Sequence, residues 1–543
     1  MDVIVVNVEV WVTDKKDIPI RGLAASDFEI LEDGKPVPIT NFSEIRTEPA
    51  AAPRPYATSP AAAPGAAAPA PQPASAPDEQ GHLVIYFDQL HLSPTGTRRL
   101  ANDLKSFLAS GPMPPERVLI LRQNFDLFTE APFGSTRQEL EAALTRLSES
   151  ATMGASDSRF GLTRLQEAWT RAQERPMPCR DFAISARGEI AVHVAAVERG
   201  ATATIDNLRL TARLLAALPG HKTLLFVSDS LETRPGAELV RFANNVCGGE
   251  RDLAELSHMA DAAQLIRRLQ DFAEEANRNR VTVYPFQPSG IQGPAMMGAE
   301  QGAVDFFAGS GVDSLLRSVR RDGLVELARQ TGGRTVFDRN RFDDDLLRLA
   351  TDMTSYYSLG YAPGRTTATG NHIIDVRLRG TLAKNARLRH RLGYRDREPE
   401  DVLQERLEGA LAFGAMRNPL GVKLAVGTLG SADKGKYGMP LHVLVPTSAI
   451  TFFPQESGER ANLRVAIQAS NPKTRKRERF EQSFSPGRPA TAQTLDLRVV
   501  LQLPEGIHVV AVGVRDELTG ESSVVATTVA IEDPATSSTP GGH

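Results

Sequence analysis

The chain is poor in cysteine and has no long hydrophobic run. Its 543 residues include two cysteines and two tryptophans, and no stretch of 18 successive apolar residues occurs, so we expect no transmembrane helix. The first residues, MDVIVVNVEVWVTD, alternate like a β-strand and lack the basic start and apolar block of a signal peptide. We take an additional N-terminal segment upstream as a hypothesis.

The charge balance and the missing motifs narrow the function classes. Lys and Arg number 62 against 66 Asp and Glu, a net charge of −4, which argues against a surface built for nucleic acid. The chain contains no G-x-S-x-G, H-E-x-x-H or C-x-x-C pattern, so the usual sequence signatures of α/β-hydrolases, zinc proteases and dithiol enzymes are absent. The composition is that of a globular protein without an obvious catalytic motif.

The two cysteines, Cys179 and Cys247, admit two interpretations. In an exported protein they would form a disulfide that restricts the unfolded chain by about 4 kcal/mol in the entropic model. Alternatively they are unrelated thiols.

Hydrophobic periodicity divides the chain into six segments. They are a β unit at 1–46, a Pro/Ala-rich linker at 47–80, alternating strands and helices at 81–353, further strands at 354–397, a helix with seven strands at 398–533, and a tail at 534–543. Strand and helix in alternation predict a doubly wound, mainly parallel sheet with helices on both faces.

The predicted fold class is therefore α/β, with this domain inserted into a β-sandwich. Residues 1–46 and 354–397 would complete that sandwich, and the C-terminal segment would form a separate antiparallel sandwich of immunoglobulin-like or transthyretin-like type. Within the α/β domain, residues 151–200 are interpreted as a long insertion that ends at a glycine, before a helix that starts near residue 204.

Two strands of the α/β domain end in an aspartate. HLVIYFD ends at Asp88, and KTLLFVSDS carries Asp229 directly after its apolar run. Parallel strands bring their carboxyl ends to one edge of the sheet, which is where ligands bind in open α/β folds. Asp88 and Asp229 are thus the first candidate site residues.

The order of these elements resembles the von Willebrand factor A (VWFA) domain. The chain to residue 395 is similar to a VWFA-related family described from acidobacterial genomes. The resemblance lies in VEVWVTDKKDIPIRGLAASDFEILEDGKPVPITNF, LVIYFDQLHLS, LPGHKTLLFVSDS, LARQTGGRTVF, SYYSLGYAPG and RLRHRLGYR. It implies a VWFA-like fold and, as the cofactor, Mg²⁺ or a similar ion held by oxygen ligands.

The implied ligands transfer only in part. Asp88 matches the first aspartate, but Leu90 and Leu92 occupy the two serine positions and cannot bind a cation. Ser93 lies one residue too late, although a local rearrangement could bring its hydroxyl into the site. Thr202 is the best match for the threonine of the second loop, and Asp229 matches the later aspartate. Two carboxylates that converge repel each other, so a metal, a water network or a basic group such as Lys222 or Arg98 must offset their charge. The alternative is that the two aspartates cap loops and helix starts.

These observations predict a non-enzymatic, adhesion-type protein that binds a protein partner and works outside the cytoplasm, in the periplasm or as a secreted protein. Two other functions stay open. One is a hydrolase whose site lies in 151–200 or 288–320, because long loops often carry function. The other is a structural component of the cell envelope.

Overall fold

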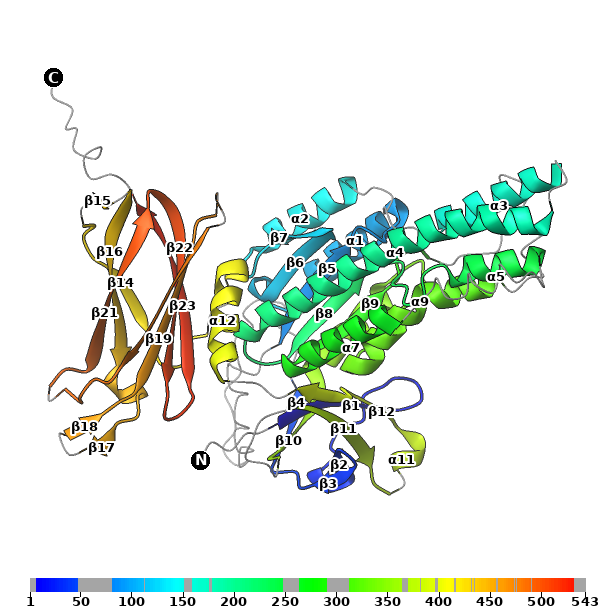
Figure 1. Cartoon of the computed structure of the whole chain (residues 1–543). Coiled ribbons are helices and arrows are strands. Elements are labelled where there is room, and N and C mark those ends of the chain that lie inside the picture. The colour runs from blue at the N-terminus through cyan, green and yellow to red at the C-terminus, as the bar shows by residue number, and fades with distance from the viewer. Residues whose placement is uncertain are drawn as a thin grey trace, which may run out of the picture.

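The computed structural model shows a mixed α/β protein with several sheets (Figure 1). The part of the chain that it describes comprises residues 6–46, 81–111, 113–150, 159–174, 178–247, 263–290, 312–363, 370–380, 382–395, 399–414, 417–430, 432–433, 435–455, 458–472, 474, 476–489 and 491–531. The predicted linker at 47–80 and the tail at 534–543 lie outside these residues. Among the described helices, none is long and apolar enough to cross a membrane.

The centre of the molecule is a five-stranded sheet in the order β7-β6-β5-β8-β9. Its strands are β5 (His82–Asp88), β6 (Val118–Asn124), β7 (Asp126–Ala131), β8 (Lys222–Val227) and β9 (Val281–Phe286). All neighbours are parallel except β7, which forms an antiparallel hairpin with β6. Beyond β9, Val336 forms a single parallel bridge with Phe286.

Helices cover both faces of this sheet, as the alternating pattern predicts. The helices of this part are α1 (Pro94–Ala109), α2 (Arg137–Glu149), α3 (Arg159–Glu174), α4 (Cys179–Leu214), α5 (Ala237–Val246), α7 (Ala263–Arg278), α9 (Val312–Thr331) and α10 (Asp343–Thr354). One apolar core joins the sheet to α4, α7 and α9, and the opposite core joins it to α1, α2 and α10. Alternate side chains of β5 enter opposite cores, because successive residues of a strand point to opposite faces.

The segment at 151–200 differs from the prediction. In its described part it is a helical hairpin of α3 and the 36-residue α4, which extends beyond the sheet (Figure 1). Gly200, taken as the end of the insertion, lies buried inside α4. Glycine weakens a helix by about 1 kcal/mol but does not end one, and the buried positions Phe182, Ala186, Ile190 and Val194 continue the helical period through this region.

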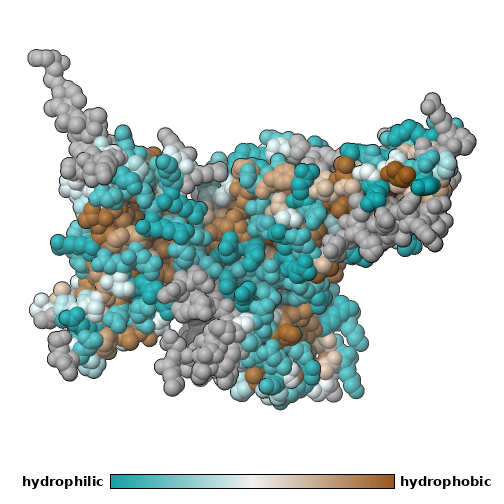
Figure 2. All heavy atoms as spheres, in the orientation of Figure 1, coloured by the Kyte–Doolittle hydropathy of each residue, from teal (hydrophilic) through white to brown (hydrophobic). Residues whose placement is uncertain are grey.

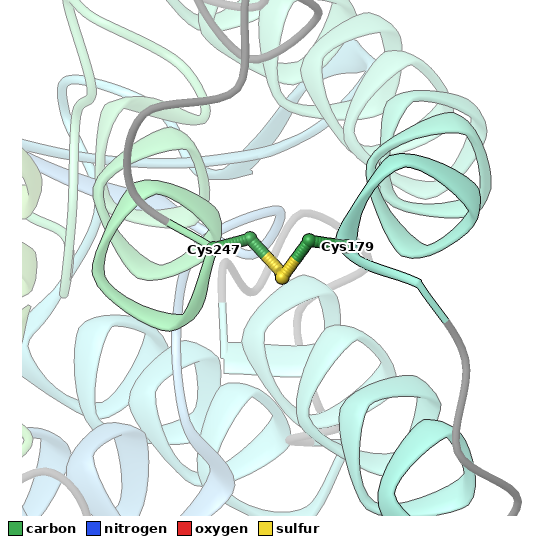
Figure 3. Close-up of a disulfide and its surroundings, with 2 residues drawn as sticks. All are labelled: Cys179 and Cys247. Carbon is green, nitrogen blue, oxygen red and sulfur yellow. A yellow bond between two sulfur atoms is a disulfide. The ribbon is translucent and has the colours of Figure 1, made fainter.

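A disulfide between Cys179 and Cys247 joins the distal ends of α4 and α5 (Figure 3). Cys179 is the first residue of α4, and Cys247 directly follows the last residue of α5. The bond confirms the predicted pairing of the two cysteines. It links residues 68 apart in sequence and so ties α5 to the start of α4.

The strands at the two ends of the α/β part pair with one another. They are β1 (Val6–Thr13), β2 (Phe28–Glu32), β3 (Lys35–Val37), β4 (Asn41–Arg46), β10 (Ser355–Tyr361), β11 (Asn371–Leu378), β12 (Arg387–His390) and β13 (Gly393–Arg395), with the short helix α11 (Leu382–Asn385). One sheet has the order β12-β1-β10-β4, and the other has the order β13-β11-β2-β3. Their inner faces share one apolar core, which contains Val8, Ile30 and Leu359. We call these two sheets the β unit.

The β unit lies against the amino edge of the central sheet, where β8 and β9 begin. The Glu9 side chain of β1 accepts a hydrogen bond from Nε of Arg280, the residue before β9. Trp11 donates through Nε1 to the backbone oxygen of Asp352 at 2.8 Å, and Arg389 donates to the Asp352 carboxylate at 2.8 Å. Arg391 donates to the backbone oxygens of Asn7 and Asn277, so it joins β1 to α7.

The C-terminal part is a two-layer antiparallel assembly. Its elements are α12 (Pro399–Phe413), β14 (Lys423–Val426), β15 (Ala432–Asp433), β16 (Lys436–Pro446), β17 (Phe453–Gln455), β18 (Gly458–Arg460), β19 (Leu463–Ser470), β20 (Arg477–Phe484), β21 (Thr494–Pro504), β22 (Gly506–Asp516) and β23 (Ser522–Ile531). One main sheet combines β14, β15, β16 and β21, and the other has the order β20-β19-β22-β23. A single apolar core lies between them.

Helix α12 lies between the C-terminal sheets and the α/β part (Figure 1). Its residues Leu403 and Leu407 pack on the outer face of β22, where a Cβ on Gly513 would come within 2.7 Å of Leu403. On its other side, a Cβ on Gly409 would come within 2.2 Å of the backbone oxygen of Leu214. Glycine at these two positions therefore permits the helix to approach both neighbours closely.

Candidate functional site at the carboxyl edge of the central sheet

The two predicted aspartates do come to the same edge of the sheet. β5 and β8 are parallel neighbours in register, so Asp88 and the residues after Val227 meet at their carboxyl ends. Both aspartate side chains are buried, with 0% and 1% of Asp88 and Asp229 exposed. The chemistry of this edge is set by what surrounds each carboxylate.

Asp88 receives hydrogen bonds from three elements. Its Oδ2 lies 2.7 Å from Nδ1 of His91 and 3.0 Å from Oγ of Ser228, and its Oδ1 lies 3.4 Å from Oγ1 of Thr204 on α4. Leu90 and Leu92, which stand at the expected serine positions, are buried, and Leu92 packs in the apolar core below. The carboxylate is thus held by side chains of the protein itself.

His91 forms an ion pair with Asp88 inside the protein. Burial by itself lowers the pKa of His91, but the charge of Asp88 and the hydrogen bond between the two side chains outweigh this effect, so the pKa lies above its ordinary value. Nε2 of His91 is buried and has no hydrogen-bond partner among the described residues. The hydrogen bond between Nδ1 and Asp88 therefore fixes the orientation of the imidazole ring.

Asp229 connects three loops. Its Oδ2 accepts from the backbone N–H of Ser93 at 2.8 Å, and its Oδ1 accepts from that of Ser289 at 2.7 Å. Its backbone oxygen accepts from Nε2 of Gln287 at 2.8 Å. Backbone donors from the loops after β5 and β9 thus meet at one carboxylate, which fixes these loops to the end of β8.

Among the described contacts, the hydroxyl groups of the other two candidate ligands, Ser93 and Thr202, reach neither Asp88 nor Asp229. Ser93 is the N-cap of α1, and its Oγ accepts from the backbone N–H of Gly96 at 3.3 Å. Thr202 lies on the groove side of α4, whereas Thr204 is the threonine that reaches Asp88. Thr202 and Thr204 point in nearly opposite directions, because residues two positions apart on a helix differ by about 200°. The prediction placed Thr202 in a loop before a helix, whereas α4 already begins at Cys179. With leucines at the two serine positions and Thr202 on the groove side, the described residues do not present the oxygen set that Mg²⁺ requires.

The expected basic groups are also elsewhere. Lys222 is the first residue of β8, at the amino edge, and its Nζ donates to the backbone oxygen of Leu218 at 3.1 Å. Arg98 lies exposed on α1. The basic side chain beside Asp88 is that of His91, a residue that the sequence analysis did not assign to this site.

Ser228, His91 and Asp88 do not form a nucleophile triad. In such a triad the serine donates to one ring nitrogen of histidine while the aspartate holds the other. Here the Ser228 hydroxyl and Nδ1 of His91 both approach Oδ2 of Asp88, and Oγ of Ser228 also lies 2.8 Å from the backbone oxygen of Ser230. The arrangement therefore supports positioning of the loops and gives no activated serine.

An apolar groove lies beside this closed rim. It has a volume of about 880 Å³ and runs between α4 and the β6–β7 turn; Phe125, Val192, Ala195, Glu198, Arg199, Thr202, Ala203 and Asp206 line it. Phe125 is 53% exposed and Val192 is 60% exposed. In the view of Figure 2, hydrophobic patches are visible on the extension formed by the α3–α4 hairpin and on the C-terminal sheets.

Phe125 is held in an unfavourable backbone conformation. Its φ is 60°, in the left-handed region that non-glycine residues rarely adopt. Its backbone oxygen accepts a hydrogen bond of 2.7 Å from Nδ2 of Asn207 on α4. The turn therefore presents an aromatic ring to solvent at the cost of backbone strain, which is typical of binding surfaces. No motif in the sequence marks this residue.

Comparisons with known proteins give little further information. No family model and no curated protein matches the chain. Among solved structures, a crystal structure of manganese-loaded TRAP protein from Plasmodium vivax aligns with 59% of this chain and 96% of that chain, at 8% sequence identity and a TM-score of 0.22. A similarity this low carries no argument about function.

Proposed function

We propose that this chain is a non-enzymatic, VWFA-like protein of the adhesion type, which binds a partner protein outside the cytoplasm. The observation that carries the proposal is the apolar groove with the strained, exposed Phe125 at the carboxyl edge. In this proposal residues 81–353 are the binding domain, and the two β parts are spacers that set its position.

The groove has the features of a protein-binding surface. Exposed aromatic side chains that fill or flank an apolar pocket contribute most of the binding energy in many interfaces. Asn207 fixes the backbone at Phe125, so the turn that carries the ring would lose little conformational entropy when a partner covers it. Val192 and Ala195 on α4 provide the opposite apolar wall.

The charges of the lining suggest the chemistry of the occupant. Glu198 and Asp206 are acidic and Arg199 is basic, and Asp206 is already paired with Arg268 at 3.0 Å. Arg199 donates to the backbone oxygen of Ala195 at 3.2 Å. We propose a partner segment that places an apolar side chain against Phe125 and Val192, with a basic side chain near Glu198.

The disulfide supports the proposed compartment. Disulfides form and persist where the environment is oxidising, as in the periplasm and outside the cell, and are rare in the cytoplasm. Cys179 and Cys247 are bonded to each other, and no described cysteine is free. This supports an extracytoplasmic site of action.

The proposal is tested by retention of proteins from the cell envelope of the native host on the immobilised full chain. Three forms are compared: the wild type, the double variant Phe125→Ser with Val192→Ser, and Ile373→Ser, which changes an exposed apolar residue of the β unit. We expect a defined protein to be retained by the wild type and the control, and its affinity, measured with the purified partner, to fall by at least about 10-fold in the double variant. Equal affinity for all three forms would contradict the groove. Retention of no protein by the wild type would favour a structural role.

A further inference from the structure

A second cluster of polar groups lies buried near the Asp88 rim and has no part in the proposed function. His193, Glu232 and Glu238 each offer one ligand atom, and these atoms all lie within 4.8 Å of one another. All three side chains are buried, with exposed fractions of 8%, 2% and 0%. A histidine nitrogen and two carboxylate oxygens at this spacing are a set that transition metal ions bind.

Three different elements bring these residues together. His193 lies in the middle of α4, Glu232 follows β8 by five residues, and Glu238 lies in the first turn of α5. The start of α5 approaches α4 closely, because Gly236 has φ 78° and a Cβ there would come within 2.6 Å of Val194. The Cys179–Cys247 disulfide fixes the far end of the same helix pair.

The second observation is that Glu238 is buried without a donor. Neither of its carboxylate oxygens has a hydrogen-bond partner among the described residues, and the same holds for Nε2 of His193. The two side chains face each other, with Nε2 of His193 3.5 Å from Oε1 of Glu238. Burial of an ionised carboxylate without compensation is costly, so such a group indicates a missing cation or a shared proton.

Charged side chains near the cluster do not supply the positive charge that the buried Glu238 carboxylate needs. Arg320 and Glu232 each make other interactions in the protein, so the case for a cation rests on Glu238. The backbone oxygen of Arg320 accepts from the N–H of Leu231 at 2.9 Å. For Glu238, His193 is the one ion-pair partner within the described residues.

We infer that His193, Glu232 and Glu238 form a binding site for a divalent transition metal ion, with Zn²⁺ as the preferred ion and Mn²⁺ as a weaker one. Imidazole favours Zn²⁺ over the hard cations, and carboxylates at about 2 Å complete its usual coordination. The ion links α4, α5 and the loop after β8, so its role is to fasten the extension to the sheet.

The first test is direct binding of Zn²⁺ to the full, tag-free, disulfide-bonded chain after treatment with a chelator. Calorimetry and metal analysis should give one ion per chain. His193→Ala and Glu238→Gln should each weaken binding by at least about 100-fold, because each removes a direct ligand. The controls are His442→Ala, a surface histidine beside Asp496, and Glu198→Gln on the same helix as His193; both should bind as the wild type does.

The second test uses the sign of a stability change. Without metal, Glu238→Gln should raise the melting temperature, because it removes a buried charge. With Zn²⁺ at about 100 times its dissociation constant, the wild type should gain several degrees and the variant none. A salt bridge between protonated His193 and Glu238 would instead make the variant less stable in both conditions and would overturn the inference.

Two further outcomes also decide the matter. Absence of Zn²⁺ and Mn²⁺ binding by the wild type would overturn the site, and so would equal binding by the wild type, His193→Ala and Glu238→Gln, which would indicate adventitious binding. The double variant Phe125→Ser with Val192→Ser should bind Zn²⁺ normally, since neither residue belongs to the cluster. Failure of the metal site and failure of the proposed partner groove are therefore separate results.

Discussion

The two edges of the central sheet are built from different kinds of interaction. At the amino edge, charged side chains from distant parts of the chain pair across an interface, as Glu9 does with Arg280. At the carboxyl edge, Asp88 and Asp229 are satisfied by side chains and backbone N–H groups of the adjoining loops and of α4. The amino edge joins the α/β part to the β unit. At the carboxyl edge, loops and helix α4 of the α/β part itself cover the strand ends.

This difference determines which part of the sheet's rim stays open to solvent. The amino edge is covered by the β unit. At the carboxyl edge, the ends of β5 and β8 are buried, and the apolar groove opens only beside them, where Phe125 follows β6. A fold of this kind usually offers the strand ends themselves to a ligand. Here the accessible groove lies at the end of β6, beside the buried ends of β5 and β8.

The histidines of the two edges also differ in the direction of their pKa. His221, next to Trp11 at the amino edge, has its pKa lowered to about 4 by burial, with Arg280 and Lys222 adding to the effect and Glu9 opposing it. His91 at the carboxyl edge has its pKa raised by Asp88 despite its burial. Changes of pH should therefore affect the two edges in opposite ways.

The largest effect is expected from Glu9→Gln at the amino edge. Burial by itself raises the pKa of Glu9, but the charges of Arg280 and Arg391 hold it at about 2. Loss of this charge leaves two guanidinium groups partly uncompensated and should lower the free energy of unfolding by about 3–5 kcal/mol. Urea denaturation measures the change. Arg377→Ala, which breaks an exposed pair with Asp375, is the control and should change it by less than about 0.5 kcal/mol. Equal effects of the two changes would contradict the comparison.

A slightly smaller effect is expected from acid at His221. The unfolded histidine takes up a proton near pH 6.5, whereas the folded one does so only near its pKa of about 4. Stability is therefore lost as the pH falls from 6.5 to 4, by about 3 kcal/mol for this residue. In His221→Gln this contribution is absent, so the slope of unfolding free energy against pH should decrease by about one proton. An unchanged slope between pH 4.5 and 6.5 would show that His221 is not responsible.

At the carboxyl edge, His91→Ala should lower the free energy of unfolding by about 2 kcal/mol at pH 6, because Asp88 loses a charged donor. The pKa of His91 is raised, so the ion pair stabilises the fold fully below pH 6.5 and loses this contribution as the pH rises through the folded-state pKa. The difference between the wild type and the variant should shrink from pH 6 to pH 9, as followed by urea denaturation. A difference that grows with pH would be inconsistent with the pair.

The smallest change in unfolding free energy is expected from the replacement of a threonine on α4. Thr204→Val removes the hydroxyl that lies 3.4 Å from Oδ1 of Asp88 and should cost about 1 kcal/mol of unfolding free energy. Thr202→Val, on the groove side of the same helix, is the matched control and should stay within about 0.5 kcal/mol. The reverse order, measured by thermal or urea unfolding, would restore Thr202 as the residue of the rim.

The sheet could be predicted from the sequence because its signals are local. LVIYF and TLLFV are continuous apolar runs, which is typical of strands buried on both faces, and helical periods separate them. The extent of α4 was missed because Gly200 was taken as a helix boundary. The buried positions from Phe182 to Val194 already carried the helical spacing that would have corrected this.

The candidate site was predictable only in part. Register places Asp88 and Asp229 at one edge, so their proximity followed from the strands alone. The partners of these carboxylates depend on the rotation of α4 and on loops far apart in sequence, which no local pattern encodes. The same holds for Glu9 and Arg280, which are 271 residues apart, and for the strained turn at Phe125.

The length of α4 has a mechanical consequence. This single helix of 36 residues spans about 54 Å, from Cys179 at the disulfide to Leu214, where Gly409 of α12 touches its backbone. The same α12 packs on β22. A force applied to the distal end of α4 would therefore reach the C-terminal sheets along the helix and through α12.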